Sequence, residues 1–95
     1  MRIVWTPRYV DELAAIGDYI GQRNQRGAHR VVNDIHGKTR LLLSANPFIG
    51  RPGEIKGTRE LVIPGTPYIV AYRVGDQQID ILFVQHGARQ WPDEV

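Results

Sequence analysis

Hydrophobic positions in the first half of the chain recur at helical spacing. Between residues 7 and 23 the apolar stripe consists of Val10, Leu13, Ala14, Gly17 and Ile20. From residue 28 a second stripe comprises Ala28, Val31, Val32, Ile35, Thr39, Leu42 and Leu43. Spacings of three and four put each set on one face of a helix. The stretch NQRG (24–27) separates the stripes and the proline of ANPF ends the second, so we expect an antiparallel helical hairpin.

A short β-rich run, RIVW (2–5), precedes the first helix. Thr6 is a typical N-cap residue, and Pro7 fits the first helical position. Trp5 and Val10 occupy the two positions of a hydrophobic staple, which fixes how the chain enters a helix. These signals together predict a strand-to-helix junction at residues 5–7.

The second half of the chain changes to strand-like spacing. After a loop rich in glycine and proline (49–58), three β-rich runs follow, RELVI (59–63), YIVAYRV (68–74) and QIDILFVQ (78–85). The turns PGTP and GDQ separate them. The element order is therefore β-α-α-β-β-β, which predicts a single α+β domain over residues 1–95, with an antiparallel sheet packed against the helical hairpin.

The register of the last hairpin follows from its short turn, which places Val74 opposite Ile79. Arg73 then lies across from Asp80 and Ala71 across from Leu82. One predicted sheet face carries Tyr68, Val70, Tyr72, Val74, Ile79, Ile81 and Phe83. The other carries Ile69, Ala71, Arg73, Asp80, Leu82, Val84 and His86.

Both predicted faces are largely apolar, whereas an antiparallel sheet with one solvated face alternates apolar and polar residues. The helical hairpin covers one face and leaves the other for a binding partner, which we expect to contact Ile69, Ala71, Leu82 and Val84. Two alternatives stay open: one helix packs on each face, or the long loop folds over the second face.

Composition narrows the function classes. The chain has no cysteine, which excludes a disulfide, a thiolate metal site and a cysteine nucleophile. No stretch approaches the roughly 20 apolar residues of a membrane span, and the N-terminus lacks the apolar core of a signal peptide. We therefore expect a cytoplasmic protein without a membrane partner. The net charge of +2 suits an acidic partner or nucleic acid.

Candidate chemistry gathers beside the last strand in HGARQWP (86–92). His86 is a candidate general acid or base, and Arg89 a candidate holder of a phosphate or carboxylate. Lys56 and Arg59 flank the entry to the strand at 59–63, and a fold that brings them beside Arg89 would make a phosphate-attracting groove. Trp91 reads as an anchor that packs the chain end on the sheet while its indole N–H finds a carbonyl.

Metal and cofactor sites are not expected. His29 and His36 share a helical face but have no third ligand in step with them. GRPG (50–53) lacks the lysine and Ser/Thr of a phosphate-binding loop. The only serine, Ser44, lies inside a predicted helix, so no serine nucleophile is proposed.

Three segments that follow the helical hairpin, NPFIGRPG, GTRELVIPGTPYIVAYRV and HGARQWP, resemble the RelE/ParE superfamily of bacterial type II toxins. The resemblance covers essentially the whole chain. It implies a toxin that arrests growth and is neutralised by a cognate antitoxin whose C-terminal segment wraps it. It also implies that the complex binds operator DNA through the antitoxin, and it supplies a cover for the apolar second face.

The superfamily divides into ribosome-dependent mRNA endoribonucleases of the RelE type and DNA gyrase inhibitors of the ParE type. Arg89 matches a basic position that the ribonucleases use near the chain end. Ile69 stands where they carry an arginine, and Glu60 and Val62 stand where RelE carries lysines. The C-terminal tyrosine of several ribonucleases is also missing from this sequence, which ends at Val95. The resemblance therefore favours ParE-like inhibition of gyrase.

Two further hypotheses stay open beside the gyrase inhibitor. In a metal-independent ribonuclease, His86 and Arg89 would be catalytic, with Lys56 and Arg59 on the phosphate. In the gyrase inhibitor, Arg89, His86 and Trp91 would instead shape the target-binding surface, with Lys56 and Arg59 as further target- or phosphate-binding residues. A degenerate toxin that only binds its antitoxin is the third hypothesis.

Overall fold

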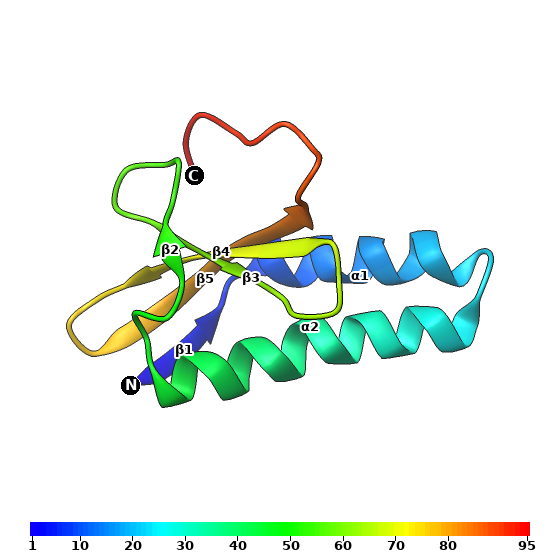
Figure 1. Ribbon diagram of the computed structural model, residues 1–95, viewed down its shortest axis with the longest axis horizontal. Helices are drawn as coiled ribbons and strands as arrows, with labels where there is room; N and C mark the ends of the chain where they lie inside the picture. Colours follow the sequence, from blue (N-terminus) through cyan, green and yellow to red (C-terminus); the bar gives the residue numbers. More distant parts are fainter.

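The computed structural model describes residues 1–95 and confirms the predicted element order (Figure 1). The elements are β1 (Arg2–Trp5), α1 (Pro7–Gly21), α2 (Gln25–Ala45), β2 (Arg51–Pro52), β3 (Arg59–Val62), β4 (Tyr68–Val74) and β5 (Gln78–His86). The loop predicted at 49–58 contains the two-residue strand β2, and α1 ends two residues earlier than predicted. Neither helix is long and apolar enough to cross a membrane.

The five strands form one sheet in the order β1-β5-β4-β3-β2. Strands β3 to β5 pair in antiparallel fashion, as predicted, and the additional strand β2 pairs antiparallel with β3. Strand β1 instead lies parallel to β5, with Ile3 opposite Ile79 and Trp5 opposite Ile81, so the sheet is mixed. The whole of the helical hairpin and three strands separate β1 from β5 in sequence, a connection long enough for parallel pairing.

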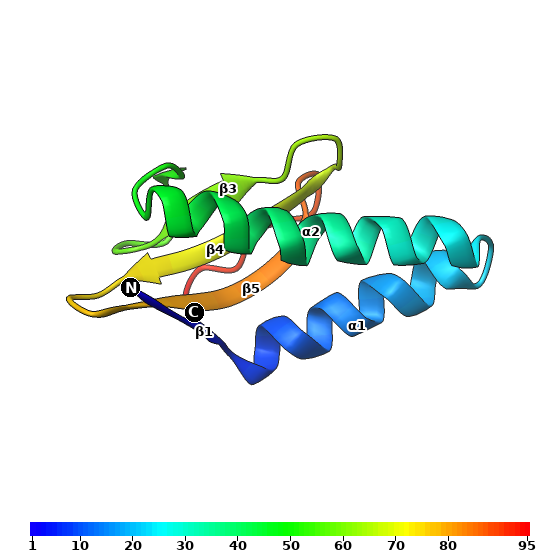
Figure 2. The ribbon, with the colours of Figure 1, turned by 90° about the horizontal axis from the view of Figure 1, so that it is seen from below.

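The helical hairpin forms where the apolar stripes predict it. The Thr6 hydroxyl accepts a hydrogen bond from the Tyr9 N–H and caps α1, and the Asn24 side chain caps α2 by accepting one from Gly27 N–H. Gly17 lets the helices approach closely, because a β-carbon there would lie 3.1 Å from Val32 Cγ2. The hairpin covers one face of the sheet, and its far end projects past the strands (Figure 2).

A β-bulge in β5 changes the predicted register part-way along the last hairpin. Val74 lies opposite Ile79 and Arg73 opposite Asp80, as predicted, but Ala71 lies opposite Phe83 and not Leu82. The extra residue reverses the alternation beyond it. Phe83 therefore turns away from the helices and Val84 faces them, the reverse of the prediction.

Helix α1 holds the bulge in place. The Glu12 carboxylate accepts a hydrogen bond from the Val84 N–H at 3.1 Å, and the Thr6 hydroxyl donates to the Ile81 carbonyl at 2.6 Å. The Arg8 guanidinium stacks on the Phe83 ring, 4.6 Å from its centroid. Backbone groups of β5 on its β1 side, at and beyond the end of β1, thus find partners at Thr6 and Glu12.

The prediction of an uncovered apolar face is wrong. Val84 is buried beneath the helices, while Ala71 and Leu82 are buried in a second cluster with Phe83 and Ile55, against which Trp91 packs. The loop between β2 and β3 and the C-terminal segment lie on the side of the sheet opposite the helices (Figure 1). The chain therefore covers both faces of its own sheet, which is the alternative in which the long loop folds over.

Candidate target-binding site

A groove of about 310 Å³ opens between α1 and the ends of β4 and β5. Its lining combines apolar and functional side chains: Glu12, Ala15, Ile16, Tyr19, Tyr68, Val84, Gln85, His86 and Arg89. The His86 and Arg89 pair predicted from the sequence therefore meets in one place. We call this the α1 groove.

His86 ends β5 and lies opposite Tyr68, whose ring it meets edge-on at 5.6 Å between centroids. Alternation predicted His86 on the other sheet face, but the bulge turns it towards α1. Its Nδ1 accepts a hydrogen bond from the Ala88 N–H at 3.0 Å, so a neutral His86 carries its proton on Nε2. Nε2 has no partner within the chain and is free to meet a ligand.

Arg89 follows one tight turn later, closed by a hydrogen bond from its N–H to the His86 carbonyl at 3.0 Å. The Arg89 side chain is exposed and makes no ion pair or hydrogen bond within the chain. It is thus a free guanidinium at the rim of the α1 groove, able to grip a carboxylate or phosphate with two parallel hydrogen bonds.

The expectation that Lys56 and Arg59 lie beside Arg89 is wrong. Arg59 lies opposite Tyr72, and a β-carbon on Gly57, next to Lys56, would lie 4.0 Å from Arg73 Nε. Both basic residues thus sit near the end of β4 remote from the α1 groove. Tyr72, opposite Arg59, lies four residues along β4 from Tyr68 at the α1 groove, about 13 Å at about 3.3 Å per residue.

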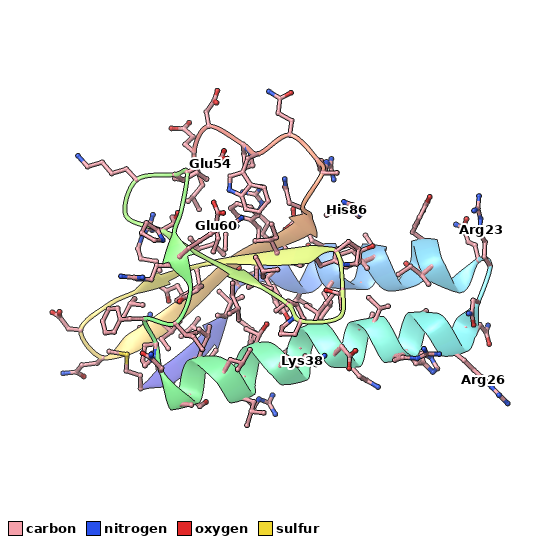
Figure 3. The ribbon with its side chains drawn as sticks, in the orientation of Figure 1. Arg23, Arg26, Lys38, Glu54, Glu60 and His86 are labelled. Carbon is pink, nitrogen blue, oxygen red and sulfur yellow. The ribbon has the colours of Figure 1, made fainter.

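Arg59 is also committed to the fold. Its guanidinium donates to the Gly50 carbonyl at 2.7 Å and to the Phe48 carbonyl at 3.3 Å, and it stacks on the Phe48 ring. The neighbouring Glu60 is buried, pairs with Arg51 and accepts a hydrogen bond from the Glu54 N–H at 2.9 Å. Figure 3 shows Glu54 and Glu60 well away from His86. The negative charge of Glu60 next to Arg59 opposes phosphate binding at Arg59.

Trp91 anchors the C-terminal segment as predicted, with its ring 5.2 Å from the Phe83 centroid. The Gln85 side chain fastens the same segment by donating to the Gln90 carbonyl at 3.1 Å. The prediction that the indole N–H finds a carbonyl is wrong, because Trp91 Nε1 is buried without a hydrogen-bond partner. Trp91 is therefore held by apolar packing, with its ring turned to the chain's own core.

His36 has a structural role. Its ring stacks on Trp5 at 4.1 Å between centroids, its Nδ1 bonds the Tyr9 hydroxyl at 3.0 Å, and Arg40 lies 3.3 Å from its Nε2. Burial, and then the positive charge of Arg40, lower the pKa of His36. No group of three or more histidine, aspartate or glutamate side chains is close enough to hold a metal ion.

The α1 side of the groove was not predicted from the sequence. Glu12, Ile16 and Tyr19 are spaced by four and three residues and so share a helical face that points at the end of β5. Tyr19 is 67% exposed. Burial, and then the nearby Tyr19 phenol, raise the pKa of Tyr68. The helical spacing of these three residues could have indicated a shared face in the sequence. That His86 lies opposite this face follows only from the bulge in β5.

Family comparison agrees with this architecture. Residues 3–91 match the family model described as the ParE toxin of the type II toxin-antitoxin system parDE. The chain belongs to the ParE toxin family. It is 45% identical over 91 residues to the Y4kP protein of Sinorhizobium fredii, covering 96% of this chain and 93% of that one. It is 35% identical over 89 residues to toxin RelE2 of Caulobacter vibrioides, covering 93% and 97%.

Solved structures place this ParE-family chain in the same fold. It matches the chromosomal ParDE system of P. aeruginosa with a TM-score of 0.83 and 31% identity, over 90% of this chain and 95% of that chain. It matches the RelBE2 toxin–antitoxin complex of Mycobacterium tuberculosis over the same shares with a TM-score of 0.55, but at 23% identity this second likeness concerns the fold alone.

Proposed function

We propose that this ParE-family toxin acts by binding DNA gyrase and not by cleaving RNA. The observation that carries the proposal is the dispersal of the basic residues. Metal-free RNA cleavage needs a group that activates the ribose hydroxyl and groups that stabilise the charged phosphorane, all around one phosphate. Only His86 and Arg89 meet in the α1 groove, while Lys56 and Arg59 lie towards the other end of β4.

The α1 groove suits recognition of a protein surface. Tyr19 and Tyr68 border it, Ile16 and Val84 line it, and Arg89 stands unpaired at its rim. Tyrosine and arginine are the residue types that most often dominate the energy of a protein interface. An apolar groove with one free cation therefore fits an acidic segment that carries an apolar anchor.

The test is a supercoiling assay with purified gyrase and the purified full chain. We expect inhibition, and Arg89→Gln should raise the inhibitory concentration by about tenfold or more, as for a central interface arginine. Arg73→Gln is the matched control, because it removes another exposed arginine at the other end of β4. The proposal fails if gyrase is untouched by the wild-type chain at micromolar concentration.

A ribosome-dependent ribonuclease is the second candidate, and the free Nε2 of His86 next to Arg89 favours it. In that case His86 would exchange the proton and Arg89 would hold the phosphate. After induction in cells, His86→Gln should abolish new mRNA 5′ ends while the protein stays folded. Sequencing that finds no new ends with the wild-type chain would eliminate this candidate.

We further propose that a cognate antitoxin neutralises the toxin, since the similar P. aeruginosa and M. tuberculosis structures are of toxin–antitoxin systems. Ala71, Leu82 and Val84 are all closed off by the chain itself, so of the residues first expected to bind the antitoxin only the half-buried Ile69 stays a candidate. We expect operator DNA to be recognised through the antitoxin.

The outer edge of β3 is a second place where the antitoxin fits. Strand β2 pairs only with Arg59 and Glu60, so Leu61 and Val62 have no strand on their outer side. A groove of about 320 Å³ runs beside them, and two of the apolar side chains that line it, Ile49 and Val62, are exposed. An extended apolar segment can add a strand to such an edge.

Isothermal titration of the full chain with its antitoxin tests this edge. Val62→Lys should weaken binding by at least tenfold, because the lysine charge would be buried under the added strand. Val10→Lys replaces a valine of similar exposure, 49% against 47%, on α1. Equal weakening by both substitutions would contradict docking at β3.

A further inference from the structure

Positive charge is concentrated at the tip of the helical hairpin. Arg23, Arg26 and Arg30 lie around the turn between α1 and α2, and no acidic residue occurs between Tyr19 and Asn33. The remainder of the chain holds nine lysines and arginines against ten acids. The net positive charge of the protein therefore resides in this one projecting element, which we call the arginine tip.

None of the three arginines is used by the fold. All are exposed, and none makes an ion pair or a side-chain hydrogen bond. By contrast Arg8, Arg51 and Arg59 each pair with a carboxylate or a carbonyl. Figure 3 shows Arg23 and Arg26 at the end of the hairpin farthest from the strands, pointing outward on either side of the turn.

The positions of the tip arginines are unfavourable for the stability of helix α2. Arg26 and Arg30 lie in its first turns, where the helix dipole is positive and no acidic residue is present to balance it. They are also four residues apart, a spacing at which like charges repel. Residues that lower the stability of their own helix are expected at functional sites, so the arginine tip is a candidate surface for binding another molecule.

The chemistry of the tip selects a phosphate ligand. Guanidinium groups beside the N-terminus of a helix bind phosphate oxygens by paired hydrogen bonds and by the helix dipole. No Phe, Tyr or Trp lies within residues 20–30 to stack on unpaired bases, which argues against single-stranded RNA. No large apolar side chain is exposed there to anchor a protein partner.

The shape of the tip selects a duplex backbone and not a groove. Two packed helices, each about 10–12 Å across and about 8–10 Å apart, make a tip about 20 Å wide. The major groove of B-DNA is only about 12 Å wide. We propose that the arginine tip binds the phosphate backbone of duplex DNA without reading its sequence, as a contact separate from the α1 groove.

Fluorescence anisotropy with a labelled 20-bp duplex of arbitrary sequence tests the proposal on the full chain. The logarithm of affinity should fall linearly with the logarithm of salt concentration, with a slope of about 0.9 for each phosphate contact. The double substitution Arg26→Gln with Arg30→Gln should reduce this slope by about 2. Replacing the same two arginines by lysine, which keeps both charges, should retain most of it.

The matched control is Arg2→Gln with Arg73→Gln. It removes two exposed charges near the β4–β5 turn, at the end of the molecule opposite the tip (Figure 1). Circular dichroism checks that every variant is folded. Equal slopes for the tip and control variants, or no duplex binding by the wild type at 50 mM salt, would overturn the proposal. The proposal would also be overturned if the tip substitutions weakened binding only to a 20-nucleotide single-stranded RNA probe. None of these results bears on gyrase inhibition.

Discussion

Replacing Leu82 with alanine tests whether the chain covers its own second sheet face. Leu82 is the extra residue of the bulge, 7% exposed and packed with Ile55 and Phe83, with Trp91 packed against the cluster. If that cover is real, truncation leaves a cavity and loses apolar burial. A buried Leu→Ala change costs about 2–5 kcal/mol, and this small cluster near the surface can partly collapse, which points to about 3 kcal/mol.

That loss is large for a chain of 95 residues, whose free energy of unfolding we expect to be about 5–14 kcal/mol. It corresponds to a fall in Tm of about 12–24 °C. Urea denaturation, followed by far-UV circular dichroism, should show a lower midpoint with an unchanged slope. Leu41→Ala makes the same chemical change at a leucine that is 70% exposed, and it should cost no more than about 0.5 kcal/mol. Similar midpoints for the two variants would refute the self-covered face.

Three further predictions concern α1 and α2. Glu12→Ala should cost about 1–3 kcal/mol in urea denaturation because it leaves the buried Val84 N–H unsatisfied, and Glu12→Gln, which keeps an acceptor, should cost less. The pKa of His36 in the folded state lies below its ordinary 6.5, so the unfolded chain binds the extra proton first as pH falls. The free energy of unfolding should therefore be full above pH 6.5 and decrease below it. His36→Gln should reduce this pH dependence. Arg26→Gln should raise the free energy of unfolding by about 0.3–1 kcal/mol in the same assay; a decrease would contradict the unfavourable dipole contact.

The sequence predicted the elements well because each is coded locally. Thr6 and Pro7 mark the start of α1, the two apolar stripes give the helices, and the short β4–β5 turn fixes Val74 opposite Ile79. The parallel pairing of β1 with β5 was not predicted, because it joins segments more than seventy residues apart that carry no shared local signal. Pairing across such a distance is decided by how the helical hairpin packs on the sheet.

The candidate site was predicted only in part, for a single geometric reason. HGARQWP correctly indicated that His86 and Arg89 would lie together, and Trp91 anchors the chain end as expected. The face on which His86 lies depends on the bulge at Leu82, which strict alternation cannot anticipate. The grouping of Lys56 with Arg89 failed because proximity to a strand end in sequence does not specify which end of the sheet the loop covers.

The bulge connects the stability of the sheet with the geometry of the α1 groove. Its extra residue lets Leu82 and Phe83 both pack in the second cluster, and it turns Val84 and His86 towards α1. Glu12 holds this arrangement through the Val84 N–H and also lines the groove. A bulge that slipped back to regular pairing would carry His86 to the opposite sheet face while Arg89 stayed in its turn. The pairing of His86 with Arg89 is therefore a property of the β5 register, and substitutions that disturb the register should disable the groove without touching a residue that binds the target.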